Sequence, residues 1–186
     1  MNRKEHLTNE GLQKIVNIRA TINKGLSDEL KIAFPNTISV PRPLVKNQII
    51  KDSHWLAGFI SAEGCFMIKI KVSHSVKIGF QVILIFQITQ HYRDALLMKS
   101  LESYLGCGGY FPRTNKNFGE FLVAKFKDLT DIIIPFFDKY PIIGVKFKDF
   151  YDFKRAAELM KNGAHLTSEG LEEIRLIKMG MNRGRN

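Results

Sequence analysis

The stretch LAGFISAEG, at residues 56–64, decides the fold that this sequence predicts. Small residues recur four positions apart, Ala57 with Ser61 and Gly58 with Ala62, so they form a stripe along one side of a helix. A helix with such a stripe can approach another helix very closely. Because small side chains bury little apolar area, the stripe predicts a domain interface between two helices; a tightly packed core helix is the alternative.

Glu63 is the residue of this stretch that points to chemistry. It lies at the C-terminal end of the predicted helix, where the negative end of the helix dipole disfavours a carboxylate. A bound divalent cation would reverse that preference. Two such helices side by side would bring two acids together, and paired carboxylates that share Mg²⁺ can activate water for phosphodiester hydrolysis. Glu63 is therefore the candidate catalytic and metal-binding residue.

The segments that follow the motif alternate between apolar and polar residues, as half-buried strands do. The first predicted strand, 65–72, turns Phe66 and Ile68 to one side. The second, 80–89, does the same with Phe80, Val82, Leu84, Phe86 and Ile88. The segment 73–79 between them contains Gly79 and predicts a hairpin loop.

The rest of the chain predicts one helix, a second hairpin and three further helices. Their ranges are a helix at 92–105, strands at 110–113 and 120–126 around a turn at 115–117, and helices at 129–139, 147–161 and 168–181. The order is α-β-β-α-β-β-α, with extra terminal helices. We therefore predict an α+β fold with one antiparallel sheet and helices on one of its faces.

That arrangement leaves the other face of the sheet open. Its polar residues are cationic or amide-bearing rather than acidic, which suits phosphates and base edges in the major groove of DNA; an ordinary solvated sheet face is the alternative. The predicted DNA-binding residues on the strands and at the loop tips are Lys69, Lys71, Ser73, Lys77, Gln81, Gln87, Arg113, Asn115 and Lys116.

Composition agrees with a nucleic-acid partner. The 186 residues carry a formal net charge of +10 and a pI of about 9.6, which favours a polyanion. Cys65 and Cys107 have no paired metal-ligand spacing and form no disulfide framework. The chain has no apolar run of membrane-spanning length and no signal-peptide pattern at its start.

An internal repeat predicts how the chain is organised. Residues 6–25 read HLTNEGLQKIVNIRATINKG and residues 165–184 read HLTSEGLEEIRLIKMGMNRG, so ten of the twenty aligned positions are identical. The offset of 159 residues is that of a whole domain rather than a solenoid repeat. We therefore expect a helical tail of a missing preceding repeat at 1–34, a linker with Pro35, Pro41 and Pro43 at 35–54, and a complete domain at 55–186.

The motif resembles the signature of the LAGLIDADG homing endonucleases. The match covers Leu56, Ala57, Gly58, Ile60, Ala62 and Gly64, with Glu63 at the acidic position. The resemblance extends to FQVILIFQITQ (80–90), LGCGGY (105–110), YPIIGVKFKDF (140–150) and the closing HLTSEGL helix. It is greatest for the C-terminal half of two-motif, single-chain members that are encoded in fungal mitochondrial introns, which implies a mitochondrial location.

The resemblance also implies roles for individual residues. Each half of such an enzyme lays a saddle-shaped sheet in the major groove, and the motif helices form the interface between the halves. Glu63 and the backbone carbonyl of Ala62 would bind Mg²⁺. Gln81 would organise water near the scissile phosphate, and Lys146 would stabilise the developing charge; both residues suit these tasks chemically.

The sequence leaves the partner and the exact function open. It has one motif, whereas the chemistry needs two acids, so a second LAGLIDADG domain is expected from a separate chain or from a homodimer. An inactive fragment is the third outcome. An RNA-binding maturase that acts on intron RNA, or a structural subunit with the same fold, are the alternatives to an endonuclease half.

Overall fold

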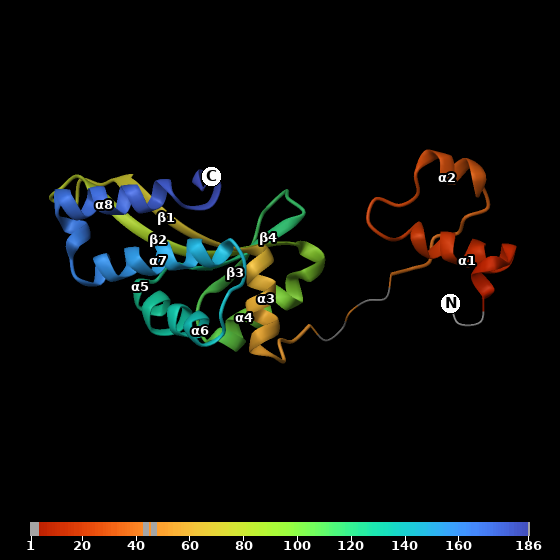
Figure 1. The fold of residues 1–186 in the computed structure, drawn as a ribbon, viewed down its shortest axis with the longest axis horizontal. Coiled ribbons are helices and arrows are strands. Elements are labelled where there is room, and N and C mark those ends of the chain that lie inside the picture. Colours follow the sequence, from red (N-terminus) through yellow and green to blue (C-terminus); the bar gives the residue numbers. More distant parts are fainter. Residues whose placement is uncertain (1–3, 43–44, 46–47, 186) are drawn as a thin grey trace. The chain divides into compact units, whose positions relative to one another are not determined.

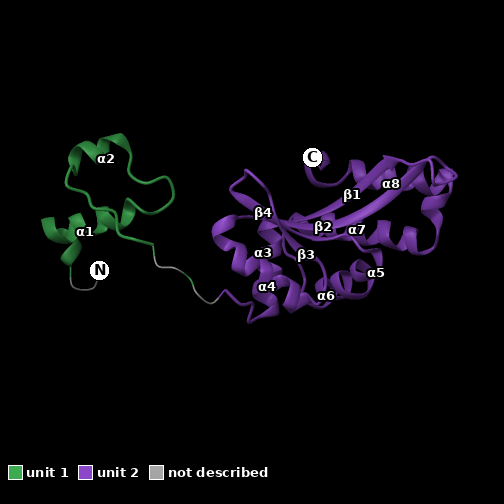
Figure 2. Cartoon of the chain, turned by 180° about the vertical axis from the view of Figure 1, so that it is seen from behind, with its two compact units in different colours: residues 1–46 green, residues 47–186 purple. Residues whose placement is uncertain are grey.

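The computed structural model describes residues 4–42, 45 and 48–185. The chain divides into two compact units, residues 1–46 and residues 47–186 (Figure 2). Part of the predicted linker, including Pro43, lies outside the described residues. In the described part of the chain no helix combines the length and the apolar character needed to cross a bilayer.

The smaller unit is built from two helices, α1 (Asn9–Arg19) and α2 (Asp28–Ala33). Thr8 caps α1 by accepting a hydrogen bond from the backbone N–H of Gly11 at 3.1 Å. The apolar side of α1 and the turn after it are largely open to solvent. The exposed fractions are 40% for Leu12, 41% for Ile15, 50% for Ile18 and 45% for Ile22.

The larger unit has the predicted α-β-β-α-β-β-α order, which confirms the α+β fold class (Figure 1). Its elements are α3 (Ser53–Glu63), β1 (Gly64–Val72), β2 (Phe80–His91), α4 (Ala95–Leu105), β3 (Gly109–Pro112), β4 (Phe118–Val123), α5 (Phe126–Asp128), a π-helical turn (Leu129–Ile133), α6 (Ile134–Lys139), α7 (Lys146–Lys161) and α8 (Ser168–Met179).

The four strands form one antiparallel sheet in the order β1-β2-β4-β3. In β1, Phe66 and Ile68 are buried while Lys69 and Lys71 are exposed, so the period-two pattern of the sequence separates a core face from an open face. The helices contribute to the same core as the buried strand residues, among them Leu56 of α3 and Leu101 of α4. The helices therefore cover one face only.

The centre of the core is a cluster of phenylalanines. The ring of Phe66 lies 5.2 Å from that of Phe86, 5.7 Å from Phe137, and 5.3 Å from both Phe150 and Phe153. These residues come from β1, β2, α6 and α7. The cluster therefore joins the strand that follows Glu63 to the helix that begins at Lys146.

The repeated segments fold alike. Thr167 caps α8 by accepting from the N–H of Gly170 at 3.1 Å, as Thr8 does for α1. A short 3₁₀ helix precedes each cap. The environments differ, however: Leu171 and Ile174 of α8 are 4% and 0% exposed, whereas the matching positions of α1 are open.

Candidate functional site

Glu63 is the last residue of α3 and its side chain is exposed. Leu56 and Ile60, both 0% exposed, anchor the helix in the core. Gly64 then passes directly into β1, and a Cβ atom at this position would lie 2.5 Å from Ile60 Cγ2. This close turn requires glycine, and it holds the carboxylate where the helix meets the sheet.

The stripe of small residues on α3 divides into two parts. Gly58 and Ala62 are exposed, and a Cβ atom at Gly58 would meet nothing within 4 Å. Trp55 and Phe59 stack beside them with their ring centroids 5.4 Å apart, and Trp55 is 48% exposed. This open surface, formed by Trp55, Gly58, Phe59 and Ala62, is called the α3 face below. It offers a flat site at which a second helix can pack closely.

Ala57 and Ser61 are engaged inside the unit. Ala57 is 3% exposed, so the prediction that its side chain lies at a domain interface is wrong: it lies about 100° around the helix from the exposed Gly58, on the core side. The Ser61 hydroxyl donates to the Ala57 carbonyl at 2.8 Å and accepts from the Ile143 N–H at 3.1 Å. Ser61 thereby ties α3 to the loop that leads into Lys146.

Lys146 begins α7 and lines an open pocket of about 980 Å³ together with Ala62 and Cys65. Two further cations, Lys178 and Arg183, line the same pocket. Burial raises the pKa of the Cys65 thiol, while the nearby Lys146 ammonium lowers it. Three cations and the carboxylate of Asp149 therefore line the pocket that adjoins the end of α3.

Lys146 and Glu63 both occupy the helix end that suits their charge least. A cation at the N-terminus of α7 faces the positive end of the helix dipole, and an anion at the C-terminus of α3 faces the negative end. Such violations of local preference are expected where a residue is kept for function rather than for stability. An anion near Lys146 and a cation near Glu63 would remove both conflicts.

Gln81 lies far from this site. In the β1–β2 register Gly64 pairs with Ile88, whereas Gln81 pairs with Lys71, seven residues along β1. At about 3.4 Å per residue this is a separation on the order of 24 Å. The predicted catalytic role of Gln81 is wrong because β2 is antiparallel and returns to Glu63 only at its other end, where Gln87 pairs with Cys65.

The open face of the sheet carries the predicted DNA-binding residues of the strands. Lys69, Lys71 and Gln81 are exposed along β1 and β2. The other predicted residues lie in the two hairpin loops, Ser73 and Lys77 after β1 and Arg113, Asn115 and Lys116 after β3, except for the half-buried Gln87 of β2. This placement is compatible with their predicted role, which stays a prediction.

Glu120 is a member of this face that sequence reasoning missed. Its carboxylate accepts from Gln87 Nε2 at 3.0 Å and from Arg113 Nε at 2.5 Å. The three side chains come from β2, β4 and the loop after β3. The pairing of β2 with β4 brings them together, and nothing in the local sequence pattern of residues 120–126 indicates that pairing. A carboxylate here can hold Arg113 in a defined orientation.

The oxygen donors at the end of α3 are those that a hard divalent cation prefers, although they form an incomplete set. Glu63 offers a carboxylate, and the last carbonyls of α3, including that of Ala62, have no helical N–H ahead of them because the chain turns into β1. Among the described residues no group of three His, Cys, Asp or Glu side chains could hold a metal. The donors fit a site shared with another domain, water and phosphate.

Comparison with known proteins identifies relatives of the chain. The profile of the family described as "LAGLIDADG endonuclease" matches residues 56–157. The probable intron-encoded endonuclease 3 of Neurospora crassa is 41% identical over 178 residues, which are 95% of this chain and 33% of the relative. The probable intron-encoded endonuclease 2 of the same fungus is also 41% identical, over 94% of this chain and 39% of the relative.

Solved structures are similar over the whole chain. The I-SmaMI LAGLIDADG homing endonuclease bound to cleaved DNA is 52% identical with a TM-score of 0.94, covering 100% of this chain and 62% of that one. The I-LtrWI LAGLIDADG homing endonuclease bound to target DNA is 44% identical with a TM-score of 0.91, again over 100% and 62%. This chain thus spans less than two thirds of the length of these proteins.

Proposed function

Because the chain belongs to the LAGLIDADG endonuclease family, we propose that residues 47–186 are one half of a site-specific double-stranded DNA endonuclease of the intron-homing type. The observation that carries the proposal is the exposed Glu63 carboxylate beside the α3 face. A second LAGLIDADG domain packed on this face would place its own acid next to Glu63. Two acids and a divalent cation then complete a hydrolytic site.

Within that site, several residues of this chain have distinct roles. Glu63 and the carbonyl of Ala62 would hold the cation, Mg²⁺ in our proposal, which would polarise the phosphodiester and activate water. Lys146 neutralises charge that develops on the phosphate oxygens. Lys69, Lys71 and Gln81 on the open face contact the major groove and the backbone of the DNA. The proposed mitochondrial location rests on relatives such as the protein in ND4 intron 1 of Podospora anserina.

The smaller unit supports a two-repeat arrangement. The side of α1 that matches the buried side of α8 is open, with Leu12 and Ile15 about 40% exposed. Since α8 packs against α7 and β1 of its own unit, we propose that α1 packs in the same way on the body of a preceding repeat. That repeat, on the same or a separate chain, is the proposed source of the second acid; a homodimer is the alternative source.

A cleavage experiment tests this function. The chain, alone and together with the matching first half, is incubated with a library of double-stranded sites and Mg²⁺. We expect double-strand cuts at one family of sites, which require the divalent cation and stop when EDTA is added. Binding of intron RNA with no cleavage of any DNA site would instead favour a maturase.

Charge removal on the open face tests the DNA interface. Lys69→Gln and Lys71→Gln should each weaken binding of all DNA sequences alike, because phosphate contacts carry no base specificity. The slope of log K against log salt concentration should fall by about 1 for each lysine. Fluorescence anisotropy at several salt concentrations measures both effects. Lys161→Gln, on the far end of α7, is the control and should leave the slope unchanged.

A further inference from the structure

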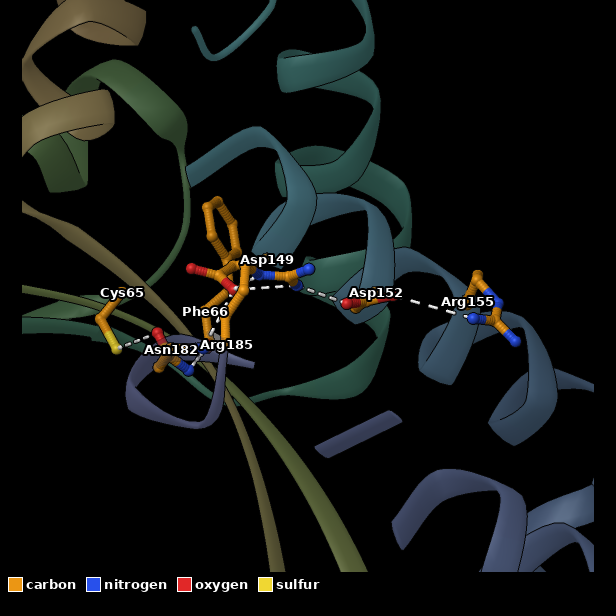
Figure 3. Close-up of polar contacts among 7 residues, drawn as sticks. All are labelled: Cys65, Phe66, Asp149, Asp152, Arg155, Asn182 and Arg185. Atoms are coloured by element: carbon orange, nitrogen blue, oxygen red, sulfur yellow. Dashed lines mark hydrogen bonds and ion pairs between the residues drawn. The ribbon is translucent and has the colours of Figure 1, made fainter. Parts of the chain in front are cut away.

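Asp149 is the one charged residue that is buried in the described part of the chain, with 5% of its surface exposed. It lies in the first turn of α7, three residues after Lys146. Its Oδ1 accepts from the backbone N–H of Asn182 at 2.9 Å and from Arg185 Nε at 3.2 Å (Figure 3). A buried carboxylate is stable only with such partners, so the turn that contains Asn182 is fixed to the start of α7.

The side chain of Asn182 reaches the opposite side of the same region. Its Nδ2 donates to the carbonyl of Phe66 at 2.9 Å, and the Cys65 thiol donates to its Oδ1 at 3.7 Å. Phe66 is the third residue after Glu63 in β1. Asn182 therefore links Phe66 to Asp149 (Figure 3), and these residues each follow by three positions the two residues of the proposed site, Glu63 and Lys146.

The contacts around this link restrict its movement. Arg185 also donates to Asp152 Oδ2 at 2.5 Å, and Arg155 lies 3.8 Å from Asp152 Oδ1. The chain after α8 is thus bound at two acidic residues of α7, one helical turn apart. This link adjoins the pocket described above, because Asp149 and Asn182 line that pocket together with Lys146.

The internal repeat indicates independently that the conformation of this turn recurs in the chain. Asn182 adopts a left-handed backbone with φ 54°, which asparagine tolerates better than most residues. The aligned residue of the first copy is Asn23, and its φ is 52°. The same residue type with nearly the same left-handed φ therefore follows the helix in both copies.

We propose that Asn182 and Asp149 are positioning residues that fix Lys146 relative to Glu63; this inference rests on the proposed nuclease function. Asn182 acts as a bridge: its backbone N–H donates to Asp149 on the helix that begins at Lys146, and its amide donates to Phe66 on the strand that follows Glu63. Neither residue touches the reacting phosphate. Their effect on cleavage comes from the separation and orientation of the two groups that do, and an error of about 1 Å in such a geometry costs about 100-fold in rate.

Asn182→Gly is the sharpest test. Glycine keeps the left-handed backbone and the N–H that Asp149 accepts, and it removes only the amide that holds Phe66. Asn182→Asp keeps the size of the side chain but replaces the Nδ2 donor with an acceptor that repels the Phe66 carbonyl. Both variants should lower the cleavage rate of bound DNA by about 100-fold and leave the dissociation constant for DNA unchanged.

The control is Thr167→Ala, which removes the N-cap of α8 without touching the bridge and lowers stability through the loss of that cap. Its cleavage rate should stay that of the wild type. If the Asn182 variants lose no more cleavage than Thr167→Ala at a similar loss of stability, Asn182 is merely structural and the inference fails.

A second readout needs no activity. Cys65 contacts the bridge and is half-buried, whereas Cys107 is buried elsewhere, and burial raises the pKa of its thiol to about 11. In Asn182→Gly, iodoacetamide should modify Cys65 several-fold faster while the rate for Cys107 stays unchanged. Equal acceleration of both thiols would indicate general loosening and overturn the inference. If the wild type cuts no DNA, the proposed function fails, and the thiol rates still decide whether Asn182 holds the two segments together.

Discussion

Glu63→Gln should abolish DNA cleavage while DNA binding persists. Glutamine has the same shape but no charge, so it cannot hold the divalent cation or stabilise the charge that develops on the phosphate. We expect the cleavage rate under single-turnover conditions to fall on the order of 10³-fold or more. The exposed side chain has no core contacts to lose, so the free energy of unfolding should change by less than about 0.5 kcal/mol.

Glu158→Gln is the matched control. Glu158 is an exposed glutamate on α7, and its substitution changes the net charge by the same amount as Glu63→Gln. It should cut like the wild type. If Glu63→Gln retained full cleavage, or if it lost DNA binding together with cleavage, the carboxylate would not be the metal-binding acid. The proposed role of α3 would then be limited to packing.

Phe66→Ala should destabilise the larger unit by about 3–5 kcal/mol, a large fraction of the total stability of a domain of this size. The ring of Phe66 is 0% exposed and contacts phenylalanines from β2, α6 and α7. Its removal leaves a cavity that rigid neighbouring rings cannot fill. Chemical denaturation, followed by circular dichroism, measures the change in the free energy of unfolding.

Phe111→Ala provides the control for that experiment. Phe111 lies on β3 and is 51% exposed, so the same truncation should cost about 1 kcal/mol or less. Equal losses for the two variants would contradict the assignment of the phenylalanine cluster as the centre of the core. A small loss at Phe66 alone would mean that the surrounding rings collapse into the space.

The connection between the core and the site explains why these two effects concern one small region. Phe66 packs the start of β1 against α7, while its backbone carbonyl accepts from Asn182. Glu63 precedes it by three residues, and Lys146 begins the helix on which it packs. The aromatic cluster therefore supports the geometry of the proposed site in addition to the stability of the fold.

Local sequence was sufficient to predict the element order, the core face of β1 and the place of Glu63 at the C-terminal end of its helix. These features depend on the side-chain period of a strand or helix, and a few neighbouring residues determine that period. The repeat at 6–25 and 165–184 was likewise evident from the sequence alone, and both copies form the expected helix. The resemblance to the LAGLIDADG family was confirmed by the family comparison.

The tertiary structure decided which distant residues meet. The strand register places Gln81 far from Glu63. Strand pairing also lets Gln87 and Arg113 donate to Glu120. The orientation of α3 about its axis places Ala57 in the core. The contact of Asp149 with Asn182 joins residues 33 positions apart, through a turn at the end of the chain. The periodicity of a segment indicates which side chains face the core. Contacts between distant residues depend instead on strand register and helix packing, which no single segment of the sequence determines.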